Sequence, residues 1–242
     1  MTGPAGGRLE GRIALVTGAS RGLGAAVAEA FAAEGARLVL VARTSGGLEE
    51  VDDAIRAAGG LTPVLVPLDL ADGEAVDRLG GALFERFGRL DVLVGNAAFL
   101  NALSPAHHIM PRDWQRSLDV NLTANWRLIR AMDPLLRQSP SGRAIFVTSG
   151  ITASPAPYWS AYAATKAALE ALVTCWAGEL AKTALKVNLV DPGVLRTAMR
   201  ARAFPGENPE SLAEPSSVVE TFISMAMPDW TLNGVRIVAA RP

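Results

Sequence analysis

A tyrosine and a lysine four residues apart are the side chains of this sequence best suited to acid–base chemistry. Tyr162 and Lys166 lie near the start of an apolar, helix-like stretch, and a spacing of four residues places both on one face of a helix. A free phenol has a pKa of about 10, and a neighbouring ammonium lowers that pKa because it favours the phenolate. The pair is therefore expected to act as a general acid and base near neutral pH. The alternative is a lysine held on the helix face for structural reasons.

A glycine-rich turn predicts a phosphate site. The sequence from Thr17 to Gly24 carries three glycines between a strand-like run and a helix-like run. Glycines let the backbone approach a ligand closely, and a helix N-terminus offers unpaired amides to a phosphate. The alternative is a tight turn without a ligand. The expected contacts are Gly18, Ser20, Arg21, Gly22, Leu23 and Gly24.

The end of the second strand-like run indicates which dinucleotide is bound. NAD sites usually place Asp or Glu there, on the ribose hydroxyls, whereas this chain has Arg43 and no carboxylate. Arg43 and Arg21 are expected to hold the 2′-phosphate of NADP(H), with NAD(H) as a possible second cofactor. Two solvated surface arginines are the alternative. Asp69 and Leu70 are expected at the adenine, since Asp72 is better placed to cap the next helix.

Ser149 ends the fifth strand-like run, thirteen residues before Tyr162. Carboxyl ends of parallel strands face the ligand crevice, so its hydroxyl is expected to hydrogen-bond the substrate oxygen. A turn serine before Gly150 is the alternative.

The Pro-rich stretch 192–215 lies at a late strand's carboxyl end and is expected to be a substrate loop.

The elements that must position these residues follow a regular alternation. Continuous apolar runs, typical of strands covered on both faces, alternate with longer helix-like stretches. This predicts an α/β fold: one doubly wound Rossmann-type domain with a seven-stranded parallel sheet and helices on both faces. The expected strands are 13–16, 38–41, 64–66, 91–94, 144–147, 187–190 and 235–238, and the expected helices are 23–34, 48–58, 73–87, 111–137 and 161–182.

Composition narrows the classes of function. The net charge of −1 gives no general attraction for nucleic acid, and no apolar run is long enough to span a membrane. The single cysteine, Cys175, is expected to be a small buried apolar residue in a cytoplasmic protein. His107 and His108 lack further ligands at metal spacing, so no metal site is expected. Residues 1–10 are expected to form a flexible tail and 11–242 a single domain.

With these motifs in order, the chain resembles the short-chain dehydrogenase/reductase family along most of its length. The family's Thr-Gly-x-x-x-Gly-x-Gly turn matches residues 17–24, and its Pro-Gly turn with a downstream Thr matches Pro192, Gly193 and Thr197. Its Asn-Asn-Ala-Gly segment is altered to residues 95–98, Gly-Asn-Ala-Ala. That departure puts the local loop geometry in question. By resemblance, the catalytic residues are Asn121, Ser149, Tyr162 and Lys166.

The resemblance also implies roles for these residues. Tyr162 exchanges the proton with the substrate oxygen, Lys166 binds the nicotinamide ribose, and Asn121 holds a water of the proton relay. Family members are commonly dimers or tetramers, so a homo-oligomer, with a homotetramer as one form, is expected through the long helices after the fourth and fifth strands. The further cofactor contacts implied are Asn96, Ala97, Pro192, Gly193, Val194 and Thr197.

The substrate is expected to be a small carbonyl or alcohol in a mostly apolar pocket. The leading hypothesis is an NADPH-dependent carbonyl reductase resembling 3-oxoacyl carrier-protein reductases. The second is an alcohol dehydrogenase that runs in the oxidative direction, and the third is a non-catalytic NADP-binding scaffold. Three arginines lie on the stretch 192–215. They either recognise an anionic substrate or only keep this stretch of chain solvated. The first candidates for the pocket are Ile151, Trp159 and Met199, followed by Thr152, Tyr158, Val194 and Phe204.

Overall fold

The computed structural model describes residues 6–239 and places a seven-stranded sheet at its centre. Every neighbouring pair of strands is parallel, and the strand order is β3-β2-β1-β4-β5-β6-β7. The predicted doubly wound fold is confirmed. The strands are β1 (Ile13–Thr17), β2 (Arg37–Ala42), β3 (Val64–Pro67), β4 (Val92–Gly95), β5 (Arg143–Val147), β6 (Lys186–Asp191) and β7 (Arg236–Val238).

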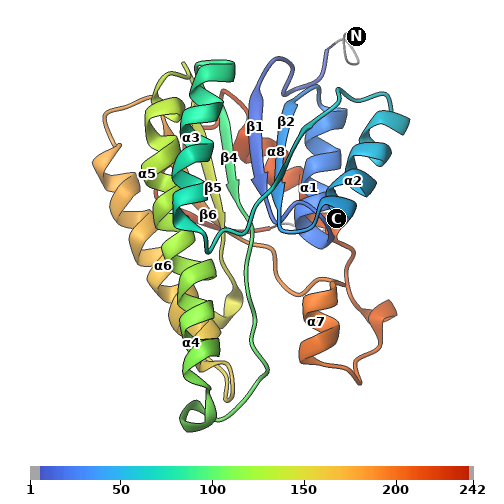
Figure 1. Cartoon of the computed structure of the whole chain (residues 1–242), viewed down its shortest axis with the longest axis vertical. Coiled ribbons are helices and arrows are strands. Elements are labelled where there is room, and N and C mark those ends of the chain that lie inside the picture. Colours follow the sequence, from blue (N-terminus) through green and yellow to red (C-terminus); the bar gives the residue numbers. More distant parts are fainter. Residues whose placement is uncertain (1–5, 240–242) are drawn as a thin grey trace.

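Helices cover both faces of this sheet (Figure 1). Side chains alternate along β1, so that Ala14 and Val16 pack against α1, α2 and α8, whereas Ile13 and Leu15 pack against α3, α5 and α6. The central strands are buried on both faces, which explains why their sequences are continuous apolar runs. The helices are α1 (Gly22–Ala33), α2 (Ser45–Ala57), α3 (Gly73–Phe87), α4 (Pro111–Leu118), α5 (Ala124–Arg137), α6 (Ser160–Glu179), α7 (Ala198–Ala203) and α8 (Val219–Ala226).

The strand order creates a crevice between β1 and β4. The chain runs outward from β1 through β2 to β3 and then returns to place β4 on the other side of β1. The connections after β1 and β4 therefore leave the sheet in opposite directions. Ligands of open α/β sheets bind at such a switch point, beyond the carboxyl ends of the strands.

Two predicted helical features are corrected by the structure. The single helix expected over 111–137 is divided by a π-helical turn at Asp119–Thr123, which separates α4 from α5. Cys175, expected to be buried, is exposed on α6. Because α6 is apolar around most of its circumference, its sequence gives little indication of which side faces the core.

The boundary of the expected flexible tail is also corrected. Residues 1–5 lie outside the described part of the chain, but Leu9 is fully buried in the core. Arg8 forms ion pairs with Glu34 and Glu220, with N–O distances of 2.6 and 2.5 Å. Residues 8–10 therefore already belong to the packed domain.

The expected substrate loop 192–215 contains regular structure. It includes the short helix α7, which stands off the carboxyl edge of the sheet in Figure 1, and a 3₁₀ turn at Pro209–Ser211. Thr197 caps α7, because its hydroxyl accepts a hydrogen bond from the Arg200 amide at 3.2 Å. Among the helices of residues 6–239, none has the length and apolar character needed to cross a membrane.

Candidate active site

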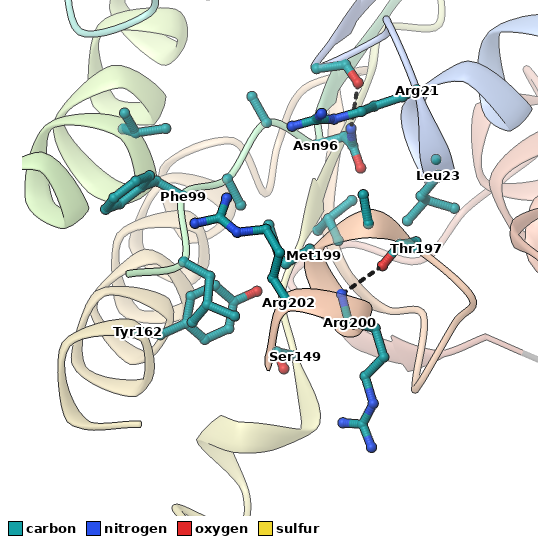
Figure 2. Close-up of a pocket in the computed structure, with 18 of the residues that line it drawn as sticks. Arg21, Leu23, Asn96, Phe99, Ser149, Tyr162, Thr197, Met199, Arg200 and Arg202 are labelled. Carbon is teal, nitrogen blue, oxygen red and sulfur yellow. Dashed lines mark hydrogen bonds between the residues drawn. The ribbon is translucent and has the colours of Figure 1, made fainter. Parts of the chain in front are cut away.

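A cleft of about 750 Å³ opens at the carboxyl edge of the sheet. It runs from the glycine-rich turn after β1 to the segment around Tyr162 and α7, as the close-up in Figure 2 shows. Three of the four predicted catalytic residues line it, and all predicted cofactor contacts except Gly24 do so. Of the three predicted substrate residues, Trp159 and Met199 line the cleft and Ile151 does not.

The glycine-rich turn has the backbone shape needed for close approach to a ligand. Gly18 and Gly22 have φ values of +65° and +58°, a region that side chains disfavour. Gly24 has another role: a Cβ at this position would lie 2.2 Å from the Gly18 carbonyl oxygen. It therefore lets α1 pack against the turn and does not line the cleft. No side chain of residues 6–239 caps the first turn of α1, so its amides are available to a phosphate.

The segment after β4 is fastened to this turn. The Asn96 side chain donates to the Thr17 carbonyl at 2.9 Å, and the Thr17 hydroxyl accepts from the amides of Asn96 and Ala97 at 3.0 and 3.1 Å. The residues present therefore fit a dinucleotide, since both backbone segments are fixed at the cleft where open α/β sheets bind such cofactors.

The altered residue Gly95 has a physical explanation. A Cβ at Gly95 would lie 2.5 Å from the ring of Phe146, its partner across β4 and β5. The aromatic side chain thus occupies the space that a side chain at position 95 would need. The hydrogen bonds of Asn96 are present with glycine at position 95. The Phe146 ring fills the space beside Gly95, so the glycine leaves no gap behind β4.

Tyr162 and Lys166 share one face of α6, as their spacing predicts. The Lys166 side chain is almost fully buried, its Nζ donates to the Val147 carbonyl at 2.7 Å, and the same atom lies 5.8 Å from the centre of the Tyr162 ring. Burial lowers the pKa of Lys166 to about 8 against the opposing effect of Glu170.

The expected direction of the Tyr162 pKa is corrected. Burial of the phenol, followed by the charge of Asp191, raises the pKa of Tyr162 to about 12. The lysine was expected to lower it, but desolvation of the buried phenol and the charge of Asp191 both act in the opposite direction. The phenol is therefore protonated near neutral pH and is ready to donate a proton.

Asn121 is fully buried in the π-helical turn and lies behind the cleft, not on its wall. Its side-chain oxygen accepts from the Phe99 amide at 2.7 Å, and its side-chain nitrogen donates to the Phe99 carbonyl at 2.9 Å and to the Thr165 hydroxyl at 3.0 Å. Asn121 thus joins the segment after β4 to α6 immediately beside Lys166.

The adenine end of the cleft carries one carboxylate. Asp72 caps α3 by accepting from the Ala75 amide at 3.0 Å, as predicted. Asp69, predicted to be left free by this cap, instead pairs with Arg116 at 2.8 Å and accepts from the Ala71 amide at 3.0 Å. An adenine amino group would share this carboxylate with Arg116.

A network of charged residues behind Ser149 was not predicted from the sequence. Arg236 of β7 pairs with Asp191 of β6 at 2.8 Å and with Glu170 of α6 at 3.3 Å, and it donates to the Ser149 carbonyl at 3.3 Å. Glu170 also accepts from the hydroxyls of Thr148 and Thr152. These residues are far apart in sequence and meet only because β5, β6 and β7 are neighbours.

We expect Arg236 to act as a positioning residue for Ser149 and α6. Arg236→Met removes the cation that pairs with Asp191 and Glu170 and should lower kcat about tenfold and the free energy of unfolding by about 2 kcal/mol. Arg236→Lys should recover part of both quantities, because it keeps the charge. The measurements are steady-state kinetics and urea unfolding; an unchanged kcat in the Met variant would contradict the positioning role.

Aromatic side chains form the wall next to Tyr162. The Trp159 ring lies 5.9 Å from the Tyr162 ring and is stacked on Phe204 at 6.0 Å, measured between ring centres. Tyr158 is exposed and has a φ of +73°.

His107 and His108 lie exposed in a short 3₁₀ turn, and residues 6–239 contain no group of three side chains placed to hold a metal ion.

Comparison with known proteins agrees with this arrangement. A family model described as short chain dehydrogenase matches residues 12–208. The oxidoreductase YciK of Escherichia coli (strain K12) is 36% identical over 217 residues, which cover 89% of this chain and 86% of that protein. The 3beta-hydroxysteroid dehydrogenase 1 of Eggerthella lenta is 36% identical over 213 residues, 87% of this chain and 80% of its own.

A solved structure of a related protein contains a cofactor. The short chain dehydrogenase of Escherichia coli CFT073, complexed with NADPH, superposes with a TM-score of 0.92 at 33% identity and covers 97% of this chain and 99% of its own. The two backbones are therefore similar over almost the whole chain and not only at the sequence motifs.

Proposed function

The chain belongs to the short-chain dehydrogenase family, and from that premise we propose that it is an NADPH-dependent carbonyl reductase with Tyr162 as its acid and base. The observation that carries the proposal is the meeting of Tyr162, Lys166 and the glycine-rich turn in one cleft. A nicotinamide cofactor supplies the hydride when bound. The remaining chemistry is a proton for the substrate oxygen, which a protonated phenol can give.

Each of the four proposed catalytic residues has its own role in the reaction. Tyr162 donates the proton to the carbonyl oxygen as negative charge develops on it. Ser149, two residues beyond β5 at the start of a 3₁₀ turn, hydrogen-bonds the same oxygen. Lys166 holds the ribose of the nicotinamide and stabilises the phenolate that remains after proton transfer. Asn121, through Phe99 and Thr165, holds the segments on which Lys166 and the cofactor depend.

The rest of the proposed cofactor site divides by position in the cleft. Ser20, Arg21 and Leu23 belong to the phosphate turn, and Leu70 accompanies Asp69 at the adenine. Thr197 and the backbone near Val194 are proposed to bind the nicotinamide carboxamide. All of these residues line the cleft.

Two arginines support a preference for NADPH over NADH. Arg21, in the turn after β1, and Arg43, directly after β2, both line the cleft, and within residues 6–239 neither side chain has a hydrogen bond or an ion pair. Two unpaired guanidinium groups at this place suit the 2′-phosphate that distinguishes NADPH from NADH.

We therefore expect Arg43→Gln to raise the Kd for NADPH about 10- to 100-fold and to change the Kd for NADH less than about threefold. Cofactor fluorescence measures both constants. Arg112→Gln is the matched control, because Arg112 is a highly exposed arginine that is absent from the cleft wall. Tighter binding of NADH than of NADPH by the parent protein would refute the preference.

A panel of ketones, aldehydes, quinones and acyl thioesters with NADPH tests the reaction itself, read as loss of cofactor absorbance. Turnover of any member supports a reductase. Oxidation of secondary alcohols with NADP⁺ but no reduction of any carbonyl would favour the dehydrogenase direction. Cofactor binding without turnover in either direction would favour the scaffold hypothesis.

We further propose a cytoplasmic homo-oligomer, a dimer or a tetramer. Trp114 of α4 and Trp126 of α5 are 41% and 44% exposed, although tryptophan usually buries its ring. They lie on the helices that follow β4, where the assembly is expected. Exposed aromatic residues of this kind are enriched at protein interfaces.

A further inference from the structure

Three arginines on the segment between β6 and α8 have different surroundings. Arg196 is paired with Glu214. Arg200 forms a two-pronged ion pair with Glu207, with both N–O distances at 2.6 Å, and its guanidinium carbon lies 3.7 Å from the centre of the Phe204 ring. The charges of these two arginines are therefore neutralised by carboxylates of the same segment.

Arg202 is different. Its side chain extends from α7 across the cleft towards Phe99, on the side where the Tyr162 hydroxyl lies, whereas Arg200 points away (Figure 2). Arg202 lines the cleft, and within residues 6–239 its guanidinium has no hydrogen bond and no ion pair. Asp69 is the one carboxylate among the described lining residues, and Arg116 neutralises it.

We propose that Arg202 binds an anionic group of the substrate, a carboxylate or a phosphate, while Tyr162 acts on a carbonyl elsewhere in the same molecule. This inference rests on the proposed reductase function and specifies its substrate class. A guanidinium binds such anions through two parallel hydrogen bonds, and an open cleft with no competing carboxylate leaves those donors available.

The walls between the two groups define the rest of the substrate. Trp159, whose ring lies beside that of Tyr162, and Phe99 both line the cleft, so the portion between carbonyl and anion should be apolar or aromatic. Arg21, in the turn after β1, and Arg43, directly after β2, are assigned to the cofactor. Arg202 is thus the one unpaired cation of the described cleft wall that the cofactor's 2′-phosphate does not require.

A pair of probes that share one ring and one aldehyde, but of which only one is charged, tests the inference. 4-Carboxybenzaldehyde carries an aldehyde and a carboxylate on one ring, and methyl 4-formylbenzoate carries the uncharged ester instead. Titration calorimetry of each probe into the NADP⁺-loaded protein at low salt should show at least tenfold tighter binding of the carboxylate. Arg202→Gln should reduce that ratio to about one and leave the Kd for NADPH within about twofold. Added salt should weaken the binding of the carboxylate probe and leave the binding of the ester unchanged.

Arg200→Gln is the matched control, since it removes an equal charge from the same helix but from a side chain that points away; it should retain the preference for the carboxylate. Equal binding of the two probes by the parent protein would overturn the inference. So would an Arg202→Gln variant that weakens NADPH binding and affects both probes alike, because Arg202 would then hold a phosphate of the cofactor. Binding is measured without turnover, so a failure of the proposed reaction would be seen separately in the carbonyl panel.

Discussion

Tyr162→Phe should lower kcat for carbonyl reduction by about 10³-fold while the Kd for NADPH stays within about twofold. The substitution removes one oxygen atom, and positioned general acids contribute about 10²- to 10⁴-fold. Within residues 6–239 the Tyr162 hydroxyl has no hydrogen bond, so its loss breaks no contact that holds the fold together. Single-turnover absorbance measures the chemical step, and cofactor fluorescence measures binding.

The same variant separates the enzyme from a scaffold. A scaffold protein would bind cofactor equally well in both forms and turn over in neither. If the Phe variant of an active parent kept more than about a tenth of its rate, another group would have to supply the proton, because removal of a working general acid costs at least about 10²-fold. Unfolding in urea provides the control, since its midpoint should be unchanged.

The sequence predicts the strands well because seven short apolar runs have no stable place except inside a doubly covered sheet. It predicts the Tyr162–Lys166 pair for a similar reason, since helix geometry fixes which residues share a face. The π-helical turn at Asp119–Thr123 is different. It accompanies hydrogen bonds between Asn121 and the backbone of Phe99, a tertiary contact with no local sequence signal.

Electrostatic quantities were the hardest to predict. The sign of the Tyr162 pKa shift depends on burial and on Asp191, which lies 29 positions further along the chain and comes close only through the packing of β6. The partners of the arginines in the segment 192–215 are equally invisible in the sequence, although they decide which of these cations is available to a ligand. Arg196 and Arg200 are paired with neighbouring carboxylates, so within residues 6–239 Arg202 is the arginine of this segment whose charge remains available in the cleft.

Lys166→Met should lower kcat/KM by about 10²- to 10³-fold, because the variant keeps the packing volume but loses the group that holds the ribose and stabilises the phenolate. The parent should show a fall in kcat/KM for reduction as pH rises through about 8, where Lys166 loses its proton. Tyr162, with a pKa of about 12, remains protonated over that interval. The Met variant should lack the fall near pH 8, and a parent profile that stays flat to pH 10 would contradict this assignment.

Stability gives an independent test of the buried amine. The pKa of Lys166 is about 8 in the folded chain and 10.5 for a solvated lysine, so between these values the unfolded chain binds more protons than the folded one. The free energy of unfolding therefore rises with pH in this window. From pH 7 to pH 10 the parent should gain about 2 kcal/mol relative to Lys166→Met, as measured by urea unfolding of both proteins. A difference independent of pH would mean that the ammonium is solvated in the folded protein, and the phenol would then be paired with a lysine of ordinary basicity.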